Sequence, residues 1–192
     1  YLEDSRYYVE DVRKFIVDIY GFDKVYKQGF NIKSPLNLNL QSIATQSLRK
    51  GLINYDQRKG WRGPIANTKN LSDWIKETKK YKLEKSIGWD LAIVKKINDF
   101  SIEIETDQQD SGKIEFNDLE WIKKNPEVIF KIGDIIYVKK IKDKSFTLEQ
   151  LPEANGGIIV MDPYTGRVLA MSGGFSFKKS EFNRASQALR QP

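Results

Sequence analysis

The segment WDLAIVKKINDFSIEIETDQQDSGKIEF, residues 89–116, decides the fold of this chain. It contains short runs rich in Ile and Val, and the middle run, SIEIET, alternates apolar and polar side chains. The turn-forming cluster DQQD separates the second run from the third. Short runs of this kind, bounded by turn residues, are typical of β-strands. We therefore expect three consecutive strands over residues 89–97, 101–106 and 111–116.

Two further strands follow at residues 133–141 (GDIIYVKKI) and 145–151 (SFTLEQL), around the turn KDKS. The segment between the third and fourth strands favours a helical connection, with Asn117 as the cap of a short helix that Pro126 ends. Five short strands with a helical connection between the third and fourth follow the order of an OB-type barrel. The expected fold class is mainly β, α+β overall, with a five-stranded OB-like barrel flanked by helices and a β-hairpin.

The residues before the barrel carry two helical patterns. Residues 5–20 repeat apolar side chains at helical spacing and end at Gly21, which predicts an amphipathic helix with a glycine C-cap. A second helix is predicted between Asn39, as its N-cap, and Gly60, as its stop. Between the helices, GFNIK at residues 29–33 predicts a short strand. The apolar face of the second helix is expected to contain Ile43, Leu48, Leu52 and Tyr55.

A hairpin is predicted near the C-terminus, in GGIIVMDPYTGRVLAMSGGF, residues 156–175. Asp162 can start the turn, Pro163 fixes φ at its second position, and Gly166 accepts a left-handed conformation. The flanking runs IIVM and RVLAM are continuously apolar, which is typical of strands covered on both faces.

Composition excludes several classes of chemistry. The chain contains neither Cys nor His, which excludes thiolate nucleophiles, Ser-His-Asp catalysis and zinc sites built on imidazole or thiolate ligands. We expect no cofactor and no metal. No apolar run approaches the roughly 18 residues of a spanning helix. The charged N-terminus, which begins without Met, does not resemble a signal peptide and indicates a piece of a longer protein.

The net charge of +6 raises the question of nucleic-acid binding. OB-folds bind single strands through their second and third strands. Residues 101–120, which cover those strands, carry seven acidic side chains against Lys113 alone, a net charge of −6, and Phe116 is the only aromatic residue there. Because phosphate would be repelled, nucleic acid is not expected as a partner.

Two Ser-x-x-Lys sequences suggest an activated serine nucleophile, Ser47 to Lys50 and Ser176 to Lys179. Neither is accompanied by Lys-Thr-Gly or Ser-x-Asn anywhere in the chain. In a Lys-rich chain such pairs arise readily by chance, and we interpret both serines as solvated surface residues.

Three stretches carry a resemblance to a known family. They are GGIIVMDPYTGRVLAMSGGFSF followed by FNRASQALRQP, the stretch from YYVEDVRKFI to LRKGLINYDQRKGWRGP, and residues 65–151. Together they cover nearly the whole chain, which resembles part of a bifunctional class A penicillin-binding protein of the 1A type.

The resemblance implies three domains: residues 1–64 as the linker between glycosyltransferase and transpeptidase, 65–151 as an OB-like accessory domain, and 152–192 as the start of the transpeptidase. The family's nucleophile motif would follow RQP, so the fragment is expected to lack both catalytic centres. Four residues match the run that approaches the active site in this family, and we expect them to have a positional role: Asn183, Arg184, Gln187 and Arg190.

For the parent protein, the resemblance implies polymerisation of lipid-linked disaccharide-peptide and cross-linking of stem peptides through a β-lactam-sensitive acyl-enzyme. It also implies an anchor in the bacterial inner membrane, with this region on the periplasmic side. The barrel is then expected to be a non-catalytic spacer between the two active sites. Two alternatives stay open, a docking module for envelope activator proteins and, more weakly, a nucleic-acid-binding OB protein.

Overall fold

The computed structural model describes residues 3–189, which form two compact units. The hairpin unit lies within residues 1–52 and 154–192, and the barrel unit comprises Ile53–Glu153. The longest helix, α3 (Leu38–Gln57), begins in the hairpin unit and ends in the barrel unit.

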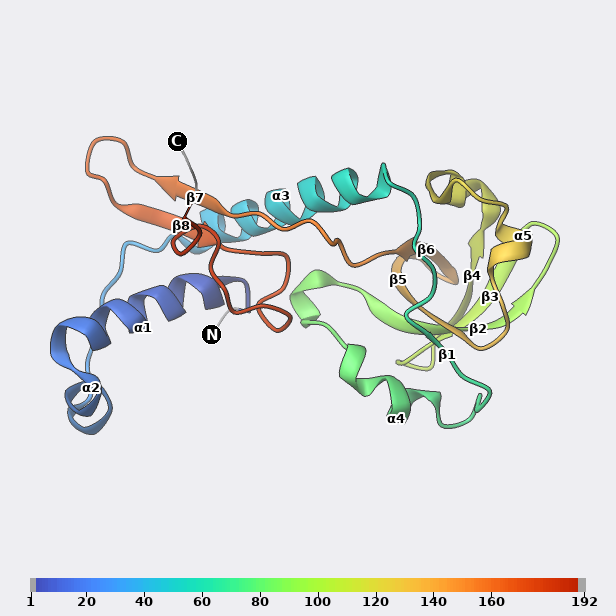
Figure 1. Cartoon of the computed structure of the whole chain (residues 1–192), viewed down its shortest axis with the longest axis horizontal. Helices are drawn as coiled ribbons and strands as arrows, with labels where there is room; N and C mark the ends of the chain where they lie inside the picture. The colour runs from blue at the N-terminus through green and yellow to red at the C-terminus, as the bar shows by residue number, and fades with distance from the viewer. Residues whose placement is uncertain (1–2, 190–192) are drawn as a thin grey trace. The chain divides into compact units, whose positions relative to one another are not determined.

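The barrel unit is a closed five-stranded barrel (Figure 1). Its strands are β2 (Asp90–Ile97), β3 (Ser101–Thr106), β4 (Ser111–Glu115), β5 (Asp134–Lys142) and β6 (Ser145–Glu149). They follow the order β5-β2-β3-β4-β6, and a further pairing of β6 with β5 closes the barrel. The β4–β6 pair is parallel and the other four pairs are antiparallel. This arrangement confirms the predicted OB-like fold class.

Both faces of β2 and β5 are buried in the first part of each strand, which explains the apolar runs there. Ala92 and Val94 belong to the cluster inside the barrel, together with Phe146 of β6. The alternate residues Leu91 and Ile93 belong to a second cluster, which contains Trp74 of α4 (Trp74–Thr78). Because successive strand residues point to opposite faces, one run of sequence supplies two clusters.

Short elements complete the barrel unit. The two-residue strand β1 (Ala66–Asn67) pairs antiparallel with β5. Three 3₁₀ helices, η2 (Lys79–Tyr81), η3 (Lys85–Ile87) and η4 (Phe116–Ile122), lie in the connections.

The connection between β4 and β5 differs from the prediction in its details. It contains η4 followed by α5 (Pro126–Ile129). Pro126 begins α5 instead of ending a helix, and Asn125 is the cap, since its side chain accepts a hydrogen bond from the Glu127 amide at 3.0 Å. Proline suits the first helical turn because its missing N–H has no helical partner there. The prediction that Asn117 caps the connecting helix is wrong because Asn117 lies inside η4, where Glu115 is the residue at the cap.

The hairpin unit is built on β7 (Ile158–Met161) and β8 (Val168–Ser172), which pair antiparallel. The 3₁₀ helix η1 (Glu3–Ser5) and α1 (Arg6–Tyr20) pack against β8, and α2 (Phe22–Gln28) follows α1 (Figure 1). In the turn of the hairpin, Asp162 accepts hydrogen bonds from the amides of Tyr164 and Thr165, and Gly166 has φ +69°. These contacts confirm the turn expected from the sequence.

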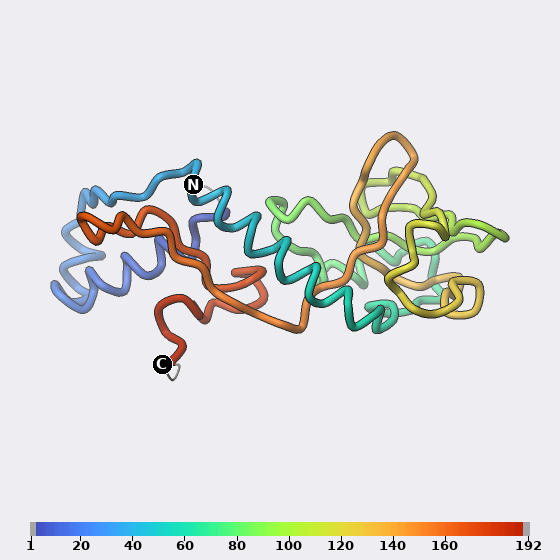
Figure 2. Tube along the Cα trace, turned by 90° about the horizontal axis from the view of Figure 1, so that it is seen from above, coloured from blue at the N-terminus to red at the C-terminus, as the bar shows by residue number. Residues whose placement is uncertain are grey.

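The predicted strand at residues 29–33 is not formed. The segment that leads from α2 to α3 runs beside the hairpin closer to α3 (Figure 2), where the Asn37 amide donates a hydrogen bond to the Leu169 carbonyl at 2.9 Å. Gln41 of α3 occupies the edge of β8 instead: its side-chain amide donates to the Met171 carbonyl and accepts from the Met171 amide, both at 2.9 Å. A glutamine side chain therefore satisfies the backbone groups that a neighbouring strand would pair.

Helix α3 buries the predicted face only in part, since Leu48 and Leu52 are half-buried whereas Tyr55 is exposed. Gln41, Ala44 and Thr45 are buried, whereas Ile43 is 59% exposed. The N-cap is Asn37 and not Asn39, because the Asn37 side chain accepts hydrogen bonds from the amides of Asn39 and Leu40. The helix also contacts strand backbone through the polar side chain of Gln41, so its apolar pattern does not mark all of the buried face.

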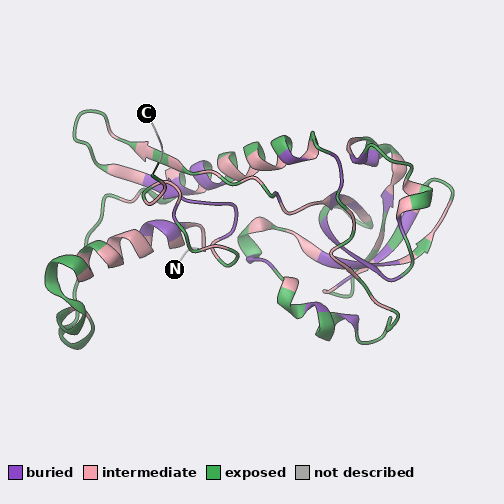
Figure 3. Ribbon diagram, viewed as in Figure 1, coloured by how far each residue is buried: buried purple, intermediate pink, exposed green. Residues whose placement is uncertain are grey.

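The hairpin is also less covered than predicted (Figure 3). Strand β7 alternates half-buried and exposed residues, and Ile159 and Met161 are 45% and 56% exposed. The interpretation of both strands as covered on both faces is therefore wrong for β7.

Candidate functional site

Asn183 lies at the centre of a hydrogen-bond network in the hairpin unit and is 2% exposed. Its side-chain nitrogen donates to Asp11 at 3.1 Å and contacts the Met171 sulfur at 3.0 Å, and its side-chain oxygen accepts from the Ala185 amide. The network joins the segment after β8 to helix α1. Gly173 makes room for this contact, since a Cβ there would lie 2.6 Å from the Asn183 Cα.

The other predicted positional residues form local contacts. Arg184 donates to the Gly173 and Phe182 carbonyls, and its guanidinium lies 5.5 Å from the centre of the Phe182 ring. The Gln187 side chain accepts a hydrogen bond from the Asn183 amide at 2.9 Å. The fourth predicted residue, Arg190, lies outside the described residues. A positional role for the run stays a prediction.

The two Ser-x-x-Lys serines differ in environment. Ser47 is exposed on α3, as predicted. Ser176 is 4% exposed, so its interpretation as a solvated residue is wrong. The Ser176 hydroxyl accepts a hydrogen bond from the Lys179 amide at 3.2 Å, and its carbonyl accepts from the Tyr7 hydroxyl. These contacts are those of a buried turn.

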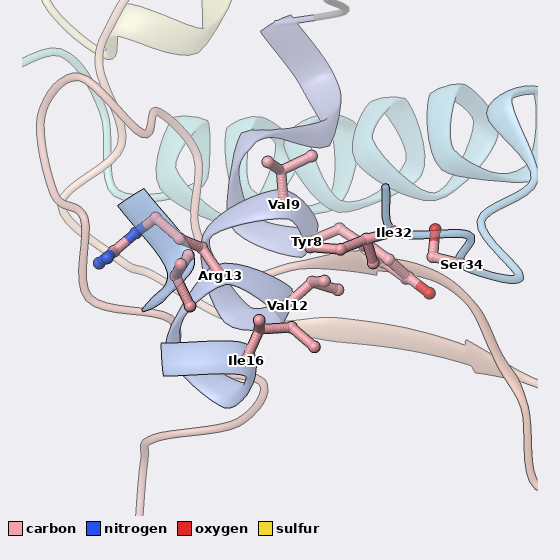
Figure 4. A pocket seen from close by; sticks show the side chains of 8 residues that line it. Tyr8, Val9, Val12, Arg13, Ile16, Ile32 and Ser34 are labelled. Atoms are coloured by element: carbon pink, nitrogen blue, oxygen red, sulfur yellow. The ribbon is translucent and has the colours of Figure 1, made fainter. Parts of the chain in front are cut away.

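A cavity of about 310 Å³ opens beside α1 (Figure 4). Its lining is mainly apolar, and Arg13 is bound to both Glu10 carboxylate oxygens at 2.6 and 2.7 Å. Burial raises the pKa of the Tyr8 phenol, and a hydrogen bond with Ser34 partly offsets this rise. The cavity suits an apolar group more than acid-base chemistry. It is lined by Tyr8, Val9, Val12, Arg13, Ile16, Val25, Ile32 and Ser34.

Asp56 joins the segment by which the chain enters the barrel unit to the segment by which it leaves. The residue lies at the end of α3 and is 2% exposed. Its carboxylate accepts hydrogen bonds from Arg62 at 3.0 Å, Gln150 at 2.7 Å and the Glu153 amide at 3.2 Å. Arg62 also donates to the Leu151 carbonyl at 2.7 Å. We call these five residues the barrel neck. The chain therefore enters and leaves the barrel at neighbouring points.

Burial alone raises the pKa of the Asp56 carboxyl, but the hydrogen bonds from Arg62, Gln150 and the Glu153 amide outweigh it and hold the pKa below its ordinary value. The carboxylate is therefore stabilised in its charged form. The sequence analysis missed this site, because it predicted the buried face of the helix from apolar residues alone, and Asp56 is not apolar.

The comparisons with known proteins cover the barrel and the whole chain. Residues 61–154 match the family described as the penicillin-binding protein OB-like domain. Penicillin-binding protein 1A of Rickettsia prowazekii is 39% identical over an alignment of 191 positions that covers 97% of this chain and 24% of that protein. The corresponding protein of Pseudomonas aeruginosa is 31% identical over 204 aligned positions, 98% of this chain and 24% of the relative.

A crystal structure of penicillin-binding protein 1A from Haemophilus influenzae superposes with a TM-score of 0.84 at 26% identity, over 96% of this chain and 28% of that one. The chain belongs to the class A penicillin-binding proteins of the 1A type. It spans about a quarter of the length of the curated relatives it matches.

The outer face of the penicillin-binding protein barrel pairs its charges across strands. Glu105 of β3 lies 3.0 Å from Lys95 of β2, and Glu103 lies 3.9 Å from Lys96. Lys113 of β4 forms an ion pair with Glu115 of the same strand. The basic side chains of β2 and β4 are therefore engaged by carboxylates.

Two other kinds of feature are missing from the described part of this penicillin-binding protein segment. Within residues 3–189, no three acidic side chains come together in a way that could hold a metal ion. In the same range, no helix has the length and apolar character needed to cross a bilayer.

Proposed function

We propose that this segment is the non-catalytic accessory part of a peptidoglycan synthase, on the periplasmic side of the bacterial inner membrane. Its relatives are penicillin-binding proteins 1A, and its barrel matches the OB-like domain of that family. In this proposal the parent protein polymerises glycan strands and cross-links their peptides, and the barrel fixes the distance between the two active sites.

The barrel neck is the observation that carries this proposal. Arg62 bonds to both Gln150 and Leu151, so the two ends of the barrel unit meet. A module whose ends meet can be inserted between two elements without changing the path of the chain around it. Such an insertion suits an accessory domain better than a domain that supplies catalytic groups.

A docking function is the second candidate, and exposed apolar side chains on the barrel unit favour it. Phe100, Val128 and Ile132 are 79%, 73% and 56% exposed. Side chains of this kind are common at protein interfaces when they gather into a patch. In this alternative the barrel binds an envelope protein that activates the synthase.

Labelling with a fluorescent penicillin tests the non-catalytic part of the proposal. We expect no covalent label on the 192-residue chain, whereas a full-length synthase treated in parallel becomes labelled. Stoichiometric labelling of Ser47 or Ser176 would contradict the proposal.

Excision of the barrel tests the spacer function in the full-length synthase. Because the ends of the barrel unit meet, Gly60 can be joined to Glu153 by a short Gly-Ser linker. We expect both activities to persist in the excised enzyme, with altered coupling between strand polymerisation and cross-linking. Unchanged coupling together with lost stimulation by an envelope protein would favour docking instead.

A further inference from the structure

A second cavity, which is shallow and widely open to solvent, has a volume of about 440 Å³ and lies in the barrel unit. It is lined by two amide side chains, two cations and one indole ring: Asn54, Gln57, Arg58, Lys123 and Trp121. We call it the Trp121 cavity. No residue of the barrel neck lines it, and it belongs to neither Ser-x-x-Lys sequence.

The fold brings these side chains together from two elements. Asn54, Gln57 and Arg58 occupy positions i, i+3 and i+4, so they share one face of the helical segment at the end of α3. Trp121 belongs to η4, whose end places Lys123 in the left-handed region at φ +56°. The Lys123 ammonium donates a hydrogen bond to the Arg58 carbonyl. A lysine held in this uncommon conformation, tied to the helix, fixes one wall of the cavity.

The indole ring provides an apolar surface with an aromatic face. Trp121 packs partly against the core inside the barrel and also lines the cavity, so its ring is held in place while part of it stays accessible. An aromatic ring that is already held in place offers a flat contact surface, and binding to it costs little conformational entropy. The apolar C–H face of a pyranose ring matches such a surface.

The polar side chains complete the pattern. Asn54 and Gln57 each offer both donors and acceptors, which fit the hydroxyl and N-acetyl groups of an amino sugar. Arg58 and Lys123 offer cations for carboxylates, and the Arg58 guanidinium is stacked 5.1 Å from the centre of the Tyr55 ring. The cavity therefore combines recognition of a sugar ring with recognition of an attached acid.

We propose that the Trp121 cavity binds a glycan of N-acetylated sugars that carry carboxylate-bearing peptides. The assignment of this glycan to the polymer made by the parent enzyme rests on the proposed function above. Binding here would hold a finished strand on the barrel.

A single-stranded nucleic acid is the competing ligand, since its bases can stack on Trp121 and its phosphates can meet the cations. Asp118 and Glu120 are exposed on the same 3₁₀ helix as Trp121. Each nucleotide of a bound strand carries a phosphate charge that these carboxylates repel, whereas a glycan carries its acids only at intervals along the strand. The observed charges therefore favour the glycan.

Titration of the isotope-labelled 192-residue chain with soluble peptidoglycan fragments, followed by NMR, tests the proposal. The chain has four Trp residues, so four indole N–H signals can be followed. We expect soluble peptidoglycan fragments to shift the Trp121 signal selectively. A neutral oligomer of N-acetylglucosamine should bind about tenfold more weakly, because it lacks the partner of the two cations.

Substitutions of side chains that line the cavity separate a loss of binding from a loss of folding. Arg58→Ala and Gln57→Ala should each weaken binding of the fragments about tenfold while the remaining spectrum stays unchanged. Lys50→Ala, an exposed substitution on the same helix outside the cavity, is the matched control and should bind normally.

Three outcomes would overturn the proposal: a Trp121 signal that does not move, equal losses in Arg58→Ala and Lys50→Ala, or tighter binding of oligo-deoxythymidine than of the fragments. These outcomes are distinct from a failure of the proposed function, which the penicillin and excision experiments detect. A chain that is not labelled by penicillin and does not bind glycan would refute this inference alone.

Discussion

At the scale of single residues, the Asp56 carboxylate concentrates the polar interactions of the barrel neck. The side chain is buried, whereas the Arg62 side chain that pairs with it is 32% exposed. A carboxylate that accepts several hydrogen bonds at a buried site is stabilising only while its partners remain in place. Removing one partner of this pair should therefore cost more than breaking an exposed ion pair and less than breaking a fully buried one.

Asp56→Asn should destabilise the barrel unit by about 2 kcal/mol, because it removes the charge that receives the Arg62 and Gln150 hydrogen bonds. Denaturant unfolding followed by tryptophan fluorescence measures this change. Asp73→Asn is the matched control: its ion pair with Lys76 is exposed on both sides and its loss should change stability by less than about 0.5 kcal/mol. Equal effects of the two substitutions would contradict this account of the neck.

The same carboxylate predicts a dependence of stability on pH. Since the pKa of Asp56 is lowered in the folded state, its contribution is fully present above the ordinary carboxyl pKa of about 3.9 and is lost as pH falls through the folded value. The difference in stability between Asp56→Asn and the unchanged chain should therefore be constant near neutral pH and shrink in acid below about pH 4. Unfolding of both proteins across this range gives the difference directly. A gap that widens in acid would reverse the predicted sign.

At the scale of elements, two glycines differ in whether the structure leaves room for a side chain. Gly112 lies in β4, where a Cβ would overlap the Phe146 ring and lie 2.8 Å from the Lys144 carbonyl oxygen. Gly51 lies in α3, where a Cβ would meet no heavy atom within 4 Å apart from its chain neighbours and the backbone of its own helix. The strand glycine allows the core to close, whereas the helix glycine only adds freedom to the unfolded chain.

Gly112→Ala should destabilise the barrel by about 1–3 kcal/mol, because the methyl group overpacks the contact with Phe146. Gly51→Ala should stabilise the chain by about 0.5–1 kcal/mol, since alanine is the better helix former. Thermal unfolding of the two variants measures the opposite shifts. Stabilisation by Gly112→Ala would show that β4 and β6 can separate without cost.

At the scale of the whole molecule, the two units have different interiors. The barrel unit contains two apolar clusters, one inside the barrel and one between the barrel and α4. The buried residues of the hairpin unit include polar side chains such as Gln41, Thr45 and Asn183. Apolar burial is the main source of stability in small domains. We therefore expect the barrel unit to be the more stable one.

Unfolding should accordingly occur in two steps. All four tryptophans, Trp61, Trp74, Trp89 and Trp121, lie in the barrel unit, so their fluorescence reports that unit alone. Far-UV circular dichroism also detects α1 and α3. We expect the dichroism signal to begin its loss at a lower denaturant concentration than the fluorescence change. Coincident transitions by both probes would instead indicate one cooperative molecule.

The sequence by itself determined the strands of the barrel, their positions along the chain and the hairpin turn. These features depend on neighbouring residues: the period of two in SIEIET, the apolar runs of β2 and β5, and the left-handed glycine at Gly166. A helical connection between β4 and β5 is also predictable, but the residue that caps it is not, because Asn117, Asn125 and Pro126 can each begin a helix.

Only the tertiary structure decided which polar side chains are buried. Gln41 bonds to the backbone at the edge of β8, and Asp56 bonds to Gln150 and Glu153, which are 94 and 97 residues away. The Ser176 carbonyl accepts a hydrogen bond from the Tyr7 hydroxyl. The Trp121 cavity likewise combines α3 with a 3₁₀ helix more than 60 residues further along the chain. A polar residue has the same local sequence signal whether water or a distant backbone group satisfies it, because burial depends on contacts that local periodicity does not encode.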